Sequence, residues 1–182
     1  MKNISAVVPL LTINFLPFRS FKDFILSLID KGHKVYAFTS DNEESELDKI
    51  ANLGAIPKHY QLSRGGLNPY QDLTNALKLY QQIKAIQPDI VFSYFIKPVI
   101  YGTLAAKLAK VPKKIAMIEG LGFAFTDQPE GLSKKAKLVQ RVQVLLFKLS
   151  LPFADKIIFL NPDDPIDLLE KNNINVNTRN IV

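Results

Sequence analysis

Short runs of β-branched and apolar residues alternate with longer amphipathic stretches along nearly the whole chain. This alternation is typical of a parallel β-sheet, because two parallel strands are joined by a crossover that is usually a helix. The expected strands are Ile4–Leu10, Lys34–Thr39, Ile56–Gln61, Ile90–Tyr94, Lys114–Ile118 and Lys156–Leu160. The expected helices are Phe18–Lys31, Glu43–Leu53, Tyr70–Ile86, Val99–Ala109, Ser133–Leu149 and Asp164–Lys171. The predicted fold class is α/β, with helices on both faces of the sheet, and Asn175–Val182 is predicted to begin a further strand.

Length and composition favour a single domain, which the alternation of strands and helices predicts to be Rossmann-like. The chain has 182 residues, of which 47% are hydrophobic and 22% charged, as in an ordinary globular domain. Cysteine is absent, which excludes a disulfide framework, a thiolate metal site and a cysteine nucleophile. His33 and His59 have no companions at metal-ligand spacing, so no metal site is expected. Since no apolar run reaches roughly 18 residues, no membrane-spanning helix is expected either.

The net charge of +6 favours a polyanionic partner, which is nucleic acid, anionic lipid or a phosphorylated substrate. Cations gather without any acid in the helix expected at Ser133–Leu149, where a basic face beside apolar residues suits an anionic membrane surface. The expected membrane-contact residues are Lys134, Lys135, Lys137 and Arg141. Alternatively, the lysines are simply solvated while the apolar stripe packs on the sheet. Phe147 and Leu151 lie off that stripe and are the candidates for lipid contact.

Nucleic acid is the least favoured polyanion, because no strand interleaves aromatic and basic residues as a base-stacking platform needs. The chain also contains neither G-x-G-x-x-G after the first strand nor G-x-x-x-x-G-K-[ST] anywhere. Dinucleotide and P-loop phosphate sites are therefore disfavoured, and no cofactor is expected.

An open parallel sheet binds its ligands beyond the carboxyl ends of its strands, so the loops that follow the strands are searched for a site. Asn14 lies in the loop after the first strand, and Arg19 begins the next helix, where it can meet an anion. The pair Gly65-Gly66 follows the third strand and permits either a close ligand approach or a plain turn. Lys97 follows the fourth strand, with Pro98 expected at the first position of the next helix. A lysine beside a helix N-terminus is a favourable seat for phosphate.

Glu119 follows the fifth strand and precedes two glycines, Gly120 and Gly122. A carboxylate beside flexible backbone can orient a sugar hydroxyl or act as a general base. The competing interpretations are a surface glutamate and a glutamate that caps the next segment.

Two segments carry a family resemblance. The first is F-S-Y-F-I-K-P-V-I-Y-G-T-L-A-A from Phe92 to Ala106, and the second is E-G-L-G-F-A-F-T from Glu119 to Thr126. The sequence D-K-G-H-K-V that starts at Asp30 is also shared. These segments resemble the N-terminal domain of GT4-type glycosyltransferases, which have the GT-B fold, in the branch that acts in capsule, O-antigen and lipid-linked oligosaccharide synthesis.

The resemblance implies that residues 1–182 are the acceptor-side half of a two-domain, metal-independent, retaining hexosyltransferase. A C-terminal domain outside this chain would bind the nucleotide-sugar, so the chain alone is expected to be inactive. The acceptor would be a sugar linked to polyprenyl diphosphate, and the location would be cytoplasmic, peripheral to the inner face of the cell membrane.

The resemblance also suggests roles for individual residues. Lys97 would neutralise acceptor phosphate, and Glu119 would be the catalytic residue that orients or deprotonates the hydroxyl. The other expected acceptor-binding residues are Asn14, Arg19, Tyr94, Gly120 and Gly122. Many relatives have a histidine in the loop after the fourth strand, where this chain has Ser93, Tyr94 and Phe95, so no histidine base is assigned. Two alternatives stay open at this point: half of a nucleotide-sugar 2-epimerase, and a non-catalytic membrane-recruiting subunit of a split glycosyltransferase.

Overall fold

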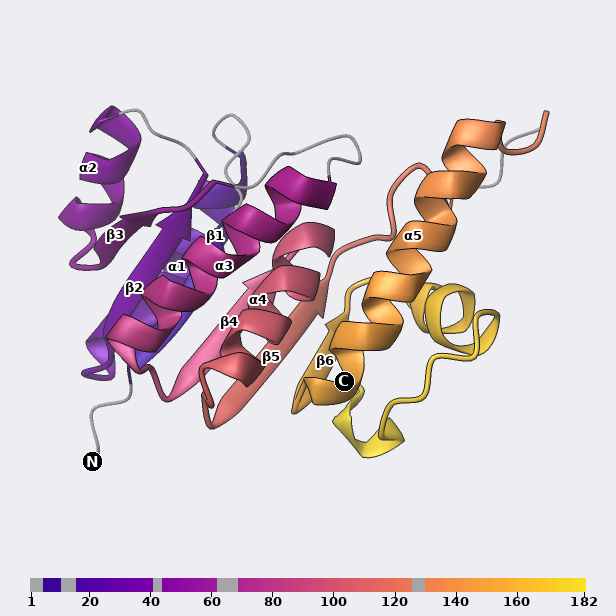
Figure 1. The fold of residues 1–182 in the computed structure, drawn as a ribbon. Coiled ribbons are helices and arrows are strands. Elements are labelled where there is room, and N and C mark those ends of the chain that lie inside the picture. Colours follow the sequence, from indigo (N-terminus) through magenta and orange to yellow (C-terminus); the bar gives the residue numbers. More distant parts are fainter. Residues whose placement is uncertain (1–4, 11–15, 41–43, 62–68, 126–129) are drawn as a thin grey trace.

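The computed structural model describes residues 5–10, 16–40, 44–61, 69–125 and 130–182. Its centre is a six-stranded sheet in which every neighbouring pair is parallel. The strands are β1 (Ser5–Leu10), β2 (Lys34–Thr39), β3 (Ile56–His59), β4 (Ile90–Tyr94), β5 (Lys113–Ile118) and β6 (Lys156–Phe159). Their order is β3-β2-β1-β4-β5-β6 (Figure 1). The order reverses between β1 and β4, and ligands bind at such a switch point in open α/β sheets.

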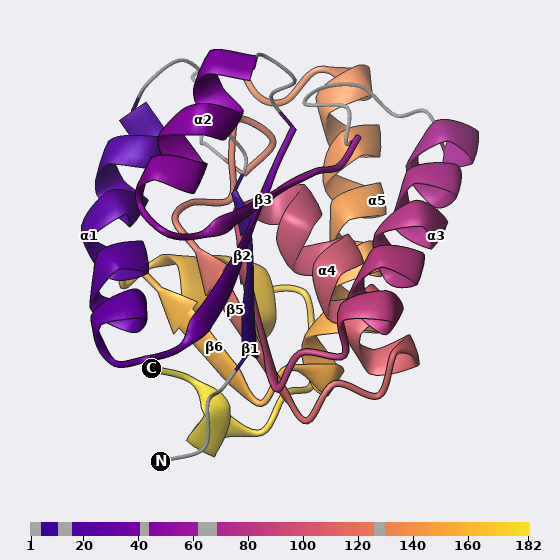
Figure 2. The ribbon, with the colours of Figure 1, turned by 90° about the vertical axis from the view of Figure 1, so that its left-hand side faces the viewer.

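Helices cover both faces of the sheet, which confirms the predicted fold class. Helices α1 (Leu16–Asp30) and α2 (Glu44–Asn52) lie on one face, and α3 (Pro69–Ile86), α4 (Ile96–Leu108) and α5 (Lys134–Ser150) lie on the other (Figure 2). Alternate strand residues supply the two cores. Val35 and Ala37 pack with α1, whereas Phe38 and Val91 pack with α3 and α4.

Helix α4 lies against the sheet more closely than an amphipathic surface helix does. Its buried residues occupy several sides of the helix and include the small residues Gly102, Ala105 and Ala106. The helix begins at Ile96, three residues earlier than predicted. Lys97 is therefore its second residue, and Pro98 is the third residue rather than the first.

The C-terminal segment differs from the prediction in two places. The helix expected over Asp164–Lys171 forms from Asp164 to Glu170, but it widens over Ile166–Glu170, where the Lys171 amide donates to the Ile166 carbonyl at 3.0 Å, five residues back. The strand expected from Asn175 does not form. Instead the Asn177 side chain accepts from the Arg179 amide at 3.1 Å and caps a short 3-10 turn, so that Ile181 alone bridges to Ile157 of β6.

Helix α5 is rotated about its axis relative to the prediction. Phe147 and Leu151, the candidates for lipid contact, are both 0% exposed and belong to the core with Ile118 and Ile157, so that prediction is wrong. The opposite face of the helix presents Leu138, Leu145 and Leu149, which are all more than half exposed. Among the described residues, no helix is long and apolar enough to span a bilayer.

Candidate active site

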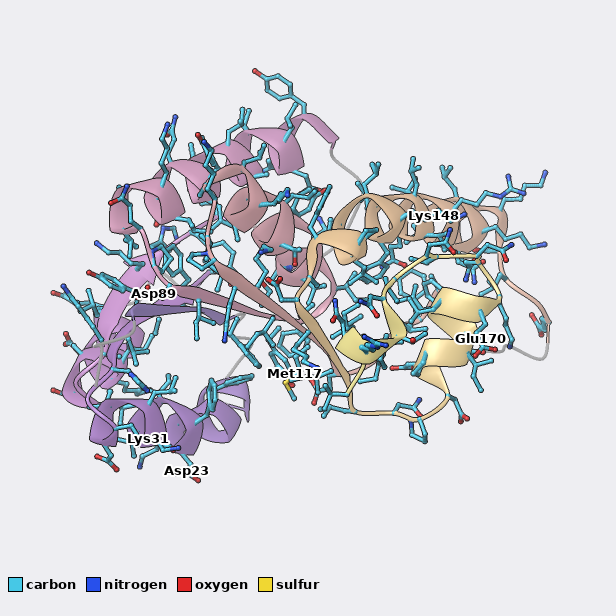
Figure 3. All side chains as sticks on the ribbon, turned by 90° about the horizontal axis from the view of Figure 1, so that it is seen from below. Asp23, Lys31, Asp89, Met117, Lys148 and Glu170 are labelled. Carbon is cyan, nitrogen blue, oxygen red and sulfur yellow. The ribbon has the colours of Figure 1, made fainter. Side chains whose placement is uncertain are left out.

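The carboxyl ends of β4 and β5 lie side by side, which brings the two most informative loops together. Ser93 pairs with Ala116 and Tyr94 with Met117 in the parallel register. Met117 lies on the side of the sheet that faces α1, where Tyr94 also packs (Figure 3). Glu119 is two residues beyond Met117, at the same edge of the sheet as the end of β4.

Tyr94 and Glu119 form a hydrogen bond across this edge, in which the tyrosine hydroxyl donates to Oε2 of the carboxylate. The Tyr94 ring is held between the Phe21 ring, at 4.5 Å between centroids, and the Phe95 ring, at 4.1 Å. Burial of the phenol and, secondarily, the Glu119 carboxylate raise the pKa of Tyr94 well above its usual range. The tyrosine therefore stays protonated and serves as a fixed donor to an exposed carboxylate.

The turn from β4 into α4 contains an unusual backbone conformation. Phe95, the residue that precedes the helix, has φ 70° and ψ 167°, a region that is almost confined to glycine. Its carbonyl accepts from the Val99 amide at 2.9 Å, while its side chain gives the helix no capping hydrogen bond. A strained residue that joins the end of β4 to the start of α4 fits a functional site, where such conformations are concentrated.

Lys97 points into the layer between α3 and α4. Its ammonium group lies 3.0 and 3.1 Å from the two carboxylate oxygens of Asp72 on α3, and the side chains are 20% and 5% exposed, respectively. The Tyr101 hydroxyl also donates to Asp72, at 3.4 Å. Burial and the neighbouring Asp72 charge raise the pKa of Tyr101 to about 12. The three side chains form a partly buried ionic cluster that joins α3 to α4.

The loop after β5 rests on the start of α4. Gly122 has φ 77°, and a Cβ atom built on it would lie 3.3 Å from Cδ1 of Ile96, so the glycine allows both the backbone turn and the close approach. Its carbonyl accepts from the Phe125 amide at 3.0 Å. Gly120 is in more open space, with no atom within 4 Å of such a Cβ.

Comparison with known proteins identifies the family. Residues 12–161 match the profile of the family described as Glycosyl transferase 4-like. The chain belongs to this glycosyl transferase 4-like family. It is also 36% identical, over 137 residues, to the N,N'-diacetylbacillosaminyl-diphospho-undecaprenol alpha-1,3-N-acetylgalactosaminyltransferase of Campylobacter jejuni. The match covers 75% of this chain and 35% of that protein, so the chain spans about a third of the relative's length.

Solved structures share the fold of this glycosyl transferase 4-like chain. A glycosyltransferase from Rickettsia africae superposes with a TM-score of 0.60 at 15% identity, over 100% of this chain and 42% of its own. An enzyme from Listeria monocytogenes described as a UDP-N-acetylglucosamine 2-epimerase superposes with 0.63 at 14% identity, over 100% and 45%. At these identities the likeness concerns the fold alone.

The structure brings some of the predicted site residues together and leaves others undescribed. Tyr94 and Glu119 are in contact, and Gly122 lies against the helix that carries Lys97. Arg19 is in the first turn of α1, but its side chain is outside what the structure describes, as are Asn14 and the Gly65-Gly66 pair. The contribution of these residues to acceptor binding stays a prediction.

Asp72 is the residue that sequence analysis of this glycosyl transferase 4-like chain missed. It is the only acid in the sequence of α3, and it stands in the first turn of that helix, where an acid is usually explained by the helix dipole. A signal was nevertheless present. In the sequence, Asp72 and Asn75 are three residues apart, so the two polar side chains are expected on one face of the helix. The structure shows that this face is turned inward, since both residues are buried.

The four predicted membrane-contact cations lie on the exposed part of α5. Lys134, Lys135, Lys137 and Arg141 are all exposed, and all belong to the N-terminal half of the helix. Lys134, Lys135 and Arg141 are three or four residues from the exposed Leu138 and therefore lie beside it on one helix face. This arrangement combines an apolar stripe with a basic border and no acid.

Proposed function

We propose that this chain is the acceptor-side domain of a glycosyltransferase that moves a sugar from a nucleotide-sugar to a lipid-linked diphosphate acceptor. The observation that carries the proposal is the Tyr94–Glu119 pair, a fixed and exposed carboxylate at the carboxyl edge of the sheet in a glycosyl transferase 4-like chain. The Campylobacter relative, named for transfer of N-acetylgalactosamine to a sugar on undecaprenyl diphosphate, supports the lipid-linked acceptor.

In the proposed reaction, an acceptor hydroxyl oxygen bonds to the anomeric carbon of the donor sugar, while the bond from that carbon to the phosphate oxygen breaks and the nucleoside diphosphate leaves. The hydroxyl proton must leave. Glu119 accepts a hydrogen bond from the hydroxyl, orients it and takes part in the removal of the proton. Tyr94 acts through Glu119 and is a positioning residue, because its hydroxyl occupies one carboxylate oxygen and leaves the other available to the acceptor.

Lys97 is proposed to meet acceptor phosphate. It is in the first turn of α4 and one fifth exposed, so a phosphate at the helix N-terminus would meet both the lysine and the helix dipole. Because Lys97 also pairs with Asp72, its ammonium group would interact with both the Asp72 carboxylate and the acceptor phosphate. The donor would bind a second domain outside this chain, with retention of anomeric configuration as in other GT4 enzymes.

The basic helix α5 is proposed to hold the domain on the cytoplasmic face of the membrane. Its exposed leucines Leu138, Leu145 and Leu149 lie between cations and would enter the headgroup region, while the cations meet anionic lipid. A domain held there would reach an acceptor whose diphosphate lies at the membrane surface.

A transfer assay on the full-length protein that contains this chain tests the proposal. The acceptor probe is N,N'-diacetylbacillosamine diphosphate linked to a farnesyl chain, which is offered with a panel of nucleotide-sugars. We expect a disaccharide product, and Glu119→Gln should lower kcat by roughly 10²-fold or more, the usual scale for a positioned acid–base group.

The matched control is Glu130→Gln, an exposed glutamate in the segment before α5, which should keep full activity. Absence of transfer from every nucleotide-sugar would contradict the proposed function. Transfer that survives Glu119→Gln would contradict only the role of Glu119.

A further inference from the structure

Phe123 is an exposed aromatic residue between buried neighbours. Its side chain is 62% exposed, whereas Leu121 is 4% and Ala124 1% exposed. Leu121 belongs to the core beneath α4 and α5, and Phe125 packs against the same core. The loop is therefore anchored on both sides of the ring, and the ring stands at its tip.

The position of this tip is fixed by contacts as well as by burial. The hydrogen bond from the Phe125 amide to the Gly122 carbonyl closes a tight turn around Phe123. Gly122 faces Ile96 at the start of α4 closely enough that a Cβ atom on it would lie 3.3 Å from Cδ1 of Ile96, so this turn needs a glycine beside the helix. Full burial of a phenylalanine side chain is worth roughly 1.5–3 kcal/mol, yet here the ring stays in solvent between buried neighbours.

The ring belongs to the same short loop as polar groups that suit a sugar. Glu119 is four residues before it and exposed, and the backbone between them includes Gly120, which has open space around it. A pyranose has hydroxyl groups on its rim and an apolar C–H face, so it matches a carboxylate and an aromatic face presented together. The negative face of an aromatic ring attracts the weakly positive hydrogens of such a face, by the same electrostatics that favours edge-to-face aromatic pairs.

We propose that the Phe123 ring is the platform on which the acceptor's sugar ring stacks, so that the reacting hydroxyl is presented to Glu119. This rests on the proposed function, to which it adds the residue that recognises the sugar part of the acceptor. A prenyl chain is the less suitable occupant, because the exposed Glu119 and the backbone polar groups of Gly120 would border it.

Equilibrium binding to the full-length protein tests the proposal with two probes. One is N,N'-diacetylbacillosamine diphosphate linked to a farnesyl chain, and the other is farnesyl diphosphate, which has no sugar. Phe123→Leu keeps an apolar side chain but removes the aromatic face, and it should weaken binding of the sugar probe roughly 3- to 10-fold, since aromatic contacts add that much beyond area. Farnesyl diphosphate should bind the variant and the wild type equally. Phe123→Trp should bind the sugar probe as the wild type does.

Phe153→Leu is the matched control. Phe153 is also an exposed phenylalanine, but it precedes β6 and so lies at the amino edge of the sheet; its loss should change neither affinity. The platform is refuted if Phe123→Leu weakens both probes equally, which would indicate prenyl contact, or if the wild type binds the sugar probe no more tightly than farnesyl diphosphate. Failure of the wild type to bind either probe would instead contradict the proposed acceptor role of the domain.

Discussion

Tyr94 and Glu119 act as one unit if the carboxylate needs the tyrosine hydroxyl to hold its orientation. Tyr94→Phe keeps the ring between Phe21 and Phe95 but removes a hydrogen bond to a charged group, which is worth about 1.5–3 kcal/mol. We expect kcat of the full-length protein to fall roughly tenfold or more. Because the tyrosine acts through Glu119, the Tyr94→Phe/Glu119→Gln double variant should be no slower than Glu119→Gln alone. Multiplied losses would show that Tyr94 contacts the acceptor by itself.

Lys97 has two candidate partners, Asp72 and the acceptor phosphate, and a variant pair separates them. Lys97→Met leaves the buried Asp72 carboxylate without the lysine cation. Loss of one partner of a fully buried pair costs about 3–5 kcal/mol, and because Lys97 is 20% exposed the loss here should be smaller but still destabilising. A second change, Asp72→Asn, removes the buried charge and should restore most of the lost free energy of unfolding, measured by denaturant titration.

Acceptor kinetics then decide the role of Lys97. If the lysine holds acceptor phosphate before and during the reaction, the double variant regains stability but keeps a raised acceptor KM with little change in kcat. An acceptor KM that returns to the wild-type value would show that Lys97 serves only to join α3 to α4.

Neither residue pair could be predicted from the sequence, although three of the four residues were named as site candidates. Tyr94 and Glu119 are 25 residues apart, and so are Asp72 and Lys97. The prediction placed Tyr94 and Glu119 correctly at the ends of neighbouring strands, because parallel strands share one carboxyl edge, whereas Lys97 lies in the first turn of α4. Which side chains meet there depends on the register of β4 against β5 and on how α3 packs against α4. Local patterns do not specify either of these.

At the scale of elements, the junction of β4 and α4 carries a conformation that its sequence conceals. Phe95 has φ 70°, and nothing in Tyr94-Phe95-Ile96 favours a positive φ, so the helix was expected to start later. We expect Phe95→Gly to be more stable than Phe95→Ala by about 1–3 kcal/mol, the usual cost of this backbone region for a residue with a Cβ atom. Both variants lose the phenylalanine ring, so the difference between their free energies of unfolding reports the cost of the backbone conformation alone. Thermal or denaturant unfolding measures it, and a more stable alanine variant would contradict the strained conformation.

Helix α5 shows why an apolar pattern can predict a helix but not its orientation. The leucines and valines of α5 lie around most of the circumference of the helix. The prediction assigned the larger group of them, the apolar stripe, to the face that packs on the sheet. The structure instead buries Ala136, Phe147 and Ser150, because the large Phe147 side chain fills the space beside Ile118 and Ile157. The space available in the core therefore determines which face of the helix is buried. That space is formed by other elements of the fold, so the sequence of the helix alone does not predict it.

The whole molecule has a strongly uneven distribution of charge. Helices α3, α4 and α5 together contain nine basic residues and one acid, Asp72, which is buried. Helices α1 and α2 contain three basic and five acidic residues. These two groups lie on opposite sides of the sheet, as the positions of Lys148 on α5 and Asp23 on α1 show (Figure 3). The net charge alone predicts a polyanionic partner, but only the order of the strands places most of the cations on one face.

This asymmetry predicts that the protein binds an anionic bilayer in one orientation, through the face formed by α3, α4 and α5. Lys134→Glu with Lys137→Glu and Lys22→Glu with Lys31→Glu change the net charge equally, and all four residues are exposed. Only the first pair lies on the proposed face. Since each cation near an anionic surface contributes about 1 kcal/mol, the first pair should weaken binding to vesicles that contain phosphatidylglycerol by 10-fold or more. The second pair should leave it nearly unchanged, and added salt should weaken binding of the wild type. Equal losses in a vesicle sedimentation assay would mean that net charge, rather than a docking face, governs the attraction.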